Sequence, residues 1–177
     1  MRPDSAELSV PRWLLLAGLG SLLFRGWLSV ALPITGDEAY FYWWGVYPDL
    51  GYYDHPPMVG WLIAAMRATL GDTLWAIRLP VLLLPIALGG LLWWTLAAID
   101  RTRAAWAVLL FWLAPINWLN VLITTDTPLI FWSVASACCL LIAERRPRLD
   151  GRAWGLYALS GLLLGAAFLS KYFSVVL

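Results

Sequence analysis

Long apolar runs alternate with short polar segments along this chain, and their lengths predict membrane-spanning helices. About 20 apolar residues in a helix are enough to cross the hydrocarbon core of a bilayer. The first run extends from about Trp13 to Ile34, and a sixth begins at Tyr172. Between them lie apolar runs at about 76–99, 104–122, 128–143 and 153–169. We therefore expect an all-α polytopic membrane protein.

The stretch from Pro57 to Leu70 is an exception, because it is too short to span. At 1.5 Å per residue it measures about 21 Å, against a hydrocarbon core of roughly 30 Å. Its apolar side chains follow helical spacing along one side, which is typical of an amphipathic helix at the membrane interface. These side chains are Val59, Leu62, Ile63, Met66 and Leu70.

The distribution of arginines predicts how the helices are oriented. Cytoplasmic loops carry an excess of Lys and Arg. If 57–70 does not span, all three arginine groups of the chain fall on the cytoplasmic side, together with the N-terminus. The segment 35–75 and the turn 117–127 then form the external face. The three groups are Arg2 and Arg12, Arg101 and Arg103, and Arg145, Arg146, Arg148 and Arg152.

The two ends of the chain also carry information. The first run is longer than the 7–15 residues or so of a signal-peptide core, so we expect an uncleaved helix rather than a cleaved leader. The last residues, from Tyr172 to Leu177, are apolar with no polar tail. This pattern suggests that the sequence is the N-terminal part of a longer membrane domain.

Composition supports the membrane assignment and excludes other classes. The chain has 177 residues, of which 62% are hydrophobic and 13% charged, whereas soluble domains carry about 25% charged residues. The net charge of +1 gives no basic face for nucleic acid. Cys138 and Cys139 lie in an apolar run without zinc or disulfide spacing, so we expect two buried small hydrophobes.

The candidate chemistry lies in the predicted external segments. Thr35 and Glu38 have the spacing of a capping box, which places Asp37 in the first turn of a short helix. Asp54 and His55 precede a double proline, which is typical of a rigid turn before a helix. Asp126 returns a third carboxylate to the same face. Each could simply be a structural cap, but acids at membrane depth usually face a cavity.

Two cations lie at the same face. Arg78 stands near the outer start of the second span, and Lys171 precedes the sixth run. Snorkelling or ion pairing is the ordinary role of such side chains, but a lipid-carrier phosphate would use the same N–H groups. His55, which is adjacent to Asp54, could contact a phosphate, transfer a proton or bind a metal ion. A divalent cation held by Asp54 and His55 is therefore an open option.

Five short motifs together resemble bacterial protein-mannosyltransferase-like glycosyltransferases, which include the aminoarabinose transferases of lipid A. The resemblance covers the chain from about residue 35 to its end. The motifs are Gly36-Asp37-Glu38-Ala39-Tyr40, Tyr53-Asp54-His55-Pro56-Pro57, Arg78-Leu79-Pro80, Thr125-Asp126-Thr127-Pro128 and Ser170-Lys171-Tyr172.

The resemblance implies a GT-C fold in the bacterial inner membrane, with juxtamembrane helices in the first external loop. It implies transfer of a sugar from a polyprenyl-phosphate donor to a lipid, glycan or protein acceptor on the non-cytoplasmic face. Asp37 matches the essential acid of the family, Glu38 the acid that often accompanies it, and Asp126 a second acid. In the aminoarabinose transferases this resemblance places a phosphate-binding Lys at the position of His55. The protein mannosyltransferases have His at that position, as this sequence does.

Two other functions remain alternatives at this stage. A secondary transporter or lipid flippase would need charges or broken helices near the bilayer midplane. The predicted spans are nearly free of charge away from their ends, with Arg25 as the exception. A non-catalytic subunit of an envelope-assembly complex would tolerate alanine at Asp37 and Asp126.

Overall fold

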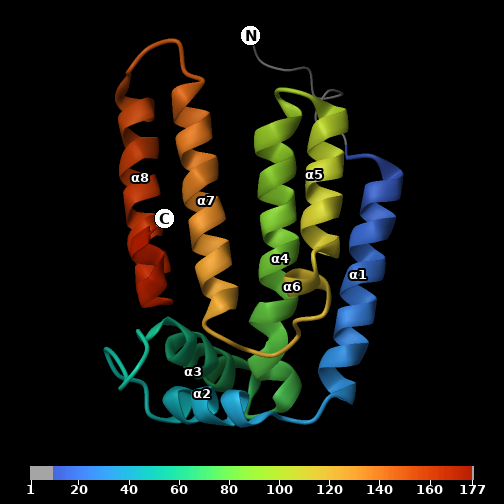
Figure 1. Ribbon diagram of the computed structural model, residues 1–177, viewed down its shortest axis with the longest axis vertical. Coiled ribbons are helices and arrows are strands. Elements are labelled where there is room, and N and C mark those ends of the chain that lie inside the picture. Colours follow the sequence, from blue (N-terminus) through green and yellow to red (C-terminus); the bar gives the residue numbers. More distant parts are fainter. Residues whose placement is uncertain (1–9, 177) are drawn as a thin grey trace.

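The protein is a bundle of helices with two further helices laid across one end (Figure 1). The computed structural model describes residues 10–176, and within that range it contains helices and no strands, which confirms the all-α prediction. The elements are α1 (Arg12–Ala31), α2 (Gly36–Val46), α3 (Met58–Leu70), α4 (Leu74–Ala97), α5 (Arg101–Leu113), α6 (Pro115–Trp118), α7 (Asp126–Glu144), α8 (Gly151–Phe168) and the 3-10 helix η2 (Tyr172–Val176).

The bundle consists of α1, α4, α5, α7 and α8, which run along the long axis of the molecule (Figure 1). Within the described residues, three of these helices are long and apolar enough to cross a membrane, namely α1, α4 and α7. The helix α8 is outside that group, although its bounds agree with the apolar run predicted at 153–169. The short helices α2 and α3 lie across the end of the bundle, as expected for 57–70.

The predicted span at 104–122 is not one continuous helix. The helix α5 has 13 residues and ends at Leu113, because Pro115 follows two residues later and disfavours helical geometry at Ala114. Ala114 is indeed extended, with φ −57° and ψ 135°. Pro115 has no N–H for the carbonyl of Phe111 four residues earlier, and Asn117 Nδ2 donates to that oxygen at 2.8 Å instead. The helix predicted at 104–122 is therefore interrupted at Pro115, and the side chain of Asn117 bonds the carbonyl that the proline leaves without a donor.

The described arginines of the three predicted cytoplasmic groups belong to the start of α1, the start of α5, and the connection from α7 to the start of α8. These parts lie at the end of the bundle opposite α2 and α3 (Figure 1). Arg145, just after α7, donates to the carbonyl of Thr95 near the end of α4 at 2.7 Å. Arg2 lies outside the described residues. This arrangement is the one that the arginine distribution predicted, while the side of the membrane on which each end lies remains a prediction.

One core of the bundle forms around Trp112 of α5. Its indole ring packs against α1 and α4, and its Nε1 donates to the carbonyl of Pro85 at 3.0 Å. Gly18 and Gly89 make room for it, since a Cβ on Gly89 would lie 2.4 Å from Nε1 and a Cβ on Gly18 would lie 2.8 Å from the ring. These glycines therefore allow a close approach of three helices.

We expect Gly89→Ala to lower the thermal midpoint of the protein in detergent. The new methyl group forces the Trp112 ring to move, and overpacking of this kind costs about 1–3 kcal/mol. Gly90→Ala is a matched control, because a Cβ at Gly90 meets nothing within 4 Å and alanine favours the helix by up to about 1 kcal/mol. Equal midpoints for the two variants would show that Trp112 is not held against α4.

Candidate functional site

The site begins at the N-terminus of α2, where the predicted capping box is present. Thr35 Oγ1 accepts a hydrogen bond from the backbone N–H of Glu38 at 3.4 Å, and the Thr35 N–H donates to Glu38 Oε2 at 3.3 Å. The cap sets where α2 begins, and it places Asp37 in the first helical turn.

Glu38 forms an ion pair with Arg78 of α4, and both side chains have an exposed fraction of 0%. Arg78 Nε donates to Oε1 at 2.8 Å and Nη2 donates to Oε2 at 2.5 Å, which is the bidentate geometry of a strong charge-assisted pair. Glu38 Oε1 also accepts the backbone N–H of Ile123 at 3.1 Å. This carboxylate therefore joins α2 to α4 and to the segment before α7.

The remaining N–H groups of Arg78 hold the end of α1. Nη1 donates to the carbonyls of Ser29 at 2.6 Å and Leu32 at 2.8 Å, and Nη2 donates to that of Pro33 at 3.0 Å. A guanidinium has five N–H donors, and all five are used here. The sequence suggested that Arg78 contacts a phosphate, but the structure leaves it no donor and no exposed surface for one.

Glu38 is equally buried and bonded. The sequence grouped it with Asp37 as a catalytic acid, yet its carboxylate is buried and both oxygens have partners. A group in this state cannot reach a substrate without breaking the pair. The geometry gives Glu38 and Arg78 the role of fixing the end of α1, the start of α2 and the segment before α7 relative to one another.

Asp37, the neighbour of Glu38, lies in the opposite environment. Its side chain is exposed, and no residue in the described range 10–176 forms a hydrogen bond or ion pair with it. Tyr40 lies three residues further on, so the two side chains share one face of α2. The Tyr40 hydroxyl donates to Asp54 Oδ1 at 3.3 Å. This contact brings the Asp54 turn to the face of α2 that carries Asp37.

His55 packs beside the aromatic side of α2. Its ring centroid lies 5.9 Å from that of Phe41 and 5.7 Å from that of Trp44. His55 Nδ1 is 3.1 Å from Asp54 Oδ2, close enough for an ion pair when the imidazole is protonated. The contact with His55 lowers the pKa of Asp54 below its ordinary value, so this carboxylate is ionised at neutral pH.

A metal ion bound by Asp54 and His55 would have no third His, Cys, Asp or Glu ligand among the described residues. No group of three or more His, Cys, Asp or Glu side chains in the part of the chain that the structure describes could hold an ion. The pair supplies two ligands, and one carboxylate oxygen already accepts from Tyr40. The described residues therefore do not form a complete metal site.

The third acid meets the second cation. Lys171 Nζ lies 2.7 Å from Asp126 Oδ1, and both side chains are partly exposed at 30% and 38%. The backbone N–H of Met58, which follows the double proline, donates to the carbonyl of Leu169 at 3.0 Å. The turn that carries Asp54 and His55 is thus bonded to the segment that carries Lys171. These contacts link the predicted residues at one end of the bundle, where α2 and α3 lie.

Sequence reasoning did not single out Tyr40 and Arg25 as site residues. Tyr40 is part of the Gly36–Tyr40 motif, and its position three residues after Asp37 is the signal that was available. Arg25 is a charge inside an apolar run, and such residues in membrane spans are usually functional or paired. It proves to be almost fully buried, with an exposed fraction of 1%.

Comparisons with known proteins identify the family of this chain. Residues 54–177 match the family of dolichyl-phosphate-mannose-protein mannosyltransferases. This chain belongs to that family. The resemblance to protein-mannosyltransferase-like glycosyltransferases of the GT-C class is thereby confirmed.

One curated member is similar over most of the chain. The lipid A galacturonosyltransferase RgtD of Rhizobium johnstonii is 32% identical over 171 residues, which cover 92% of this chain. They cover 34% of the relative, so the chain spans about a third of its length. No solved structure matches.

We expect the Glu38–Arg78 pair to show a large coupling in a double-mutant cycle. Removing one partner leaves the other charged and buried, at a cost of about 3–5 kcal/mol, whereas removing both costs less. Glu38→Gln and Arg78→Met should each lower the thermal midpoint in detergent strongly, and the double variant should recover part of the loss. Additive effects of the two changes would contradict this buried pair.

Proposed function

We propose that this chain forms the N-terminal part of the membrane domain of a glycosyltransferase. The enzyme transfers a sugar from a polyprenyl-phosphate donor to an acceptor on the non-cytoplasmic face, with inversion at the anomeric carbon. The observation that carries the proposal is the contrast at the start of α2. Glu38 is buried and fully bonded, while the adjacent Asp37 is exposed and has no partner in the described residues.

Asp37 is the proposed general base. In the reaction, the acceptor oxygen attacks C1 of the sugar from the face opposite the C1–O–phosphate bond. That bond breaks, and its electron pair leaves with the polyprenyl phosphate. If the acceptor is a hydroxyl group, its proton passes to the Asp37 carboxylate. If the acceptor is a phosphate, no proton needs to be removed, and Asp37 orients the acceptor instead.

The leaving phosphate needs cationic donors, because negative charge accumulates on it as the bond breaks. Lys171 and His55 are the proposed donors, since both are partly exposed and both lie at the end of the bundle that carries Asp37. Asp126 accepts a hydrogen bond from the Lys171 ammonium group, and Asp54 lies close enough to His55 to pair with its ring when the ring is protonated. Arg78 and Glu38 act at a distance from the substrate, as positioning residues.

A lipid acceptor is favoured among the three acceptor classes. The similar protein RgtD is described as a lipid A galacturonosyltransferase, so an acceptor of that kind, with a sugar hydroxyl or phosphate at the membrane surface, is the first to test. The family match also counts against the transporter and assembly-subunit alternatives. The orientation in the bacterial inner membrane, with a cytoplasmic N-terminus, is part of the proposal.

The central test is Asp37→Asn in purified full-length protein. We expect transfer from a panel of polyprenyl-phosphate sugars to lipid A to fall by at least about 100-fold, because general-base catalysis contributes roughly 10²–10⁴-fold. Asp49→Asn is a matched control, since Asp49 is another exposed acid of the same loop, and should retain activity. Full activity of Asp37→Asn would remove Asp37 from the mechanism.

A second test concerns the phosphate contact of Lys171. Lys171→Met should lower kcat as well as raise the KM for the donor, so that kcat/KM falls by about 10-fold or more, because a hydrogen bond to a charged group contributes about 1.5–3 kcal/mol and the phosphate gains charge as the bond breaks. Arg148→Met changes an exposed cation on the loop between α7 and α8, at the opposite end of the bundle, and should leave kcat/KM unchanged. An unaltered kcat/KM in Lys171→Met would mean that the ion pair with Asp126 is its whole role.

A further inference from the structure

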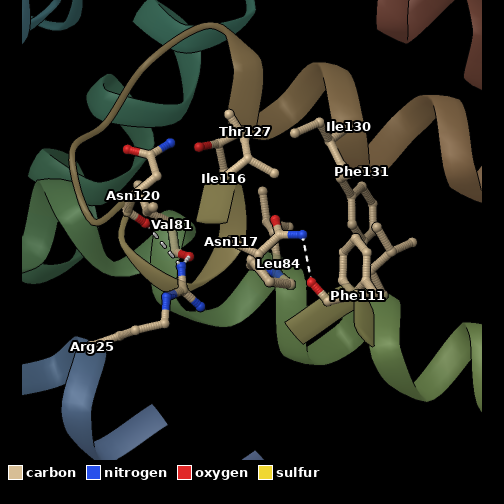
Figure 2. A pocket seen from close by; sticks show the side chains of 12 residues that line it. Arg25, Val81, Leu84, Phe111, Ile116, Asn117, Asn120, Thr127, Ile130 and Phe131 are labelled. Carbon is tan, nitrogen blue, oxygen red and sulfur yellow. Dashed lines mark hydrogen bonds between the residues drawn. The ribbon is translucent and has the colours of Figure 1, made fainter. Parts of the chain in front are cut away.

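Arg25 lies inside the apolar helix α1, and its side chain is among the largest fully buried ones in the protein. It extends from α1 toward α4 and toward the segment that precedes α7 (Figure 2). A charged group in the interior of a membrane span costs several kcal/mol unless it is well bonded. Nη2 of Arg25 donates to two backbone carbonyls, whereas its Nε is buried without a hydrogen-bond partner among the described residues.

The first acceptor is the carbonyl of Val81 in α4, which Arg25 Nη2 contacts at 2.5 Å. In an unbroken helix this oxygen would accept the N–H of residue 85, but that residue is Pro85 and has no N–H. The carbonyl is thus left free within the bundle. Arg25 supplies the missing donor from a neighbouring helix.

The second acceptor lies in the non-helical segment 119–125, between α6 and α7. Arg25 Nη2 donates to the carbonyl of Asn120 at 3.3 Å. Three residues later, the N–H of Ile123 donates to the buried carboxylate of Glu38. Val121 and Ile123 have exposed fractions of 0%. Two buried charged side chains therefore hold this segment at successive points.

The segment leads directly into Asp126, the first residue of α7. Arg25, Asn117, Asn120 and Thr127 are among the residues that line a cavity of about 10 Å³, which is room for about one water molecule. Figure 2 shows these side chains around it. Because segment 119–125 continues directly into α7, a displacement of the segment would also displace Asp126 and Thr127.

We propose that Arg25 is a positioning residue, which anchors segment 119–125 to α4 and so keeps Asp126 in contact with Lys171. The inference rests on the proposed function, in which Lys171 binds the donor phosphate and Asp126 holds it. Arg25 touches neither substrate nor Lys171. It acts through the backbone of the segment, from a position deep in the bundle.

The test compares three variants of the full-length protein. Arg25→Met keeps the apolar stem and removes every donor, and Arg25→Lys keeps one ammonium group. Arg145→Met is the matched control, because Arg145 also donates to a carbonyl of α4, that of Thr95, at the opposite end of the bundle. The two readouts are transfer kinetics per folded molecule and amide hydrogen exchange of residues 119–125.

In Arg25→Met, we expect kcat to fall by about 10- to 100-fold, since displacement of a reacting group by about 1 Å can cost 10²-fold. Exchange in residues 119–125 should accelerate. Arg25→Lys should recover part of kcat, but not all, because an ammonium does not reproduce the planar fork of arginine. Arg145→Met should stay within about twofold of the unmodified protein in both readouts.

A purely structural role would reduce the amount of folded protein and leave kcat per folded molecule unchanged, and that result would overturn the proposal. Unchanged exchange in residues 119–125 would overturn it as well. If Arg25→Met does not fold, Arg25→Lys takes its place, with the same two outcomes. Absence of transfer in the unmodified protein counts against the proposed function instead, and the exchange measurement then decides whether Arg25 holds the segment.

Discussion

Glu38 and Arg78 carry opposite charges at two positions with no exposed surface, and their contact joins four parts of the chain. Removing both charges from water is costly, and a buried pair is tolerated only when further hydrogen bonds satisfy the remaining donors and acceptors. The carbonyls of residues 29, 32 and 33 and the N–H of Ile123 provide those bonds. The same bonds fix where α1 ends, where α2 begins and how the segment before α7 runs.

A second constraint concerns the prolines of the bundle. Backbone groups inside a membrane domain must find partners within the protein, and each proline leaves a carbonyl without its usual donor. Asn117 repairs the break made by Pro115, and Arg25 repairs the one made by Pro85. Asn117 is close in sequence to the break that it satisfies, whereas Arg25 comes from another helix. These bonds give the irregular segment 114–125 a defined path although little of it is helical.

The features that depend on local sequence were predictable. Apolar run lengths located the helices, the capping box between Thr35 and Glu38 located the start of α2, and the arginines identified one end of the bundle. Pro115 is itself a local indication of the helix break, but it lies within an otherwise continuous apolar run, and the run length predicted one unbroken span. The partners of Arg78 could not be predicted, because a motif of three residues gives no indication of a carboxylate 40 positions away. That distance is why a phosphate was assigned to a guanidinium whose donors were already used.

The adjacent acids Asp37 and Glu38 show why such a site needs both buried and exposed members. A carboxylate that holds the backbone must be desolvated and fully bonded, and in that state it is unable to accept a proton from a substrate. A carboxylate that acts on a substrate must keep a free lone pair. Asp37, for which we propose such a role, has no partner in the described residues and is held only by its helix. Placing the two acids side by side on one capped helix resolves this conflict, since the rigid bonds of Glu38 fix the backbone from which Asp37 projects.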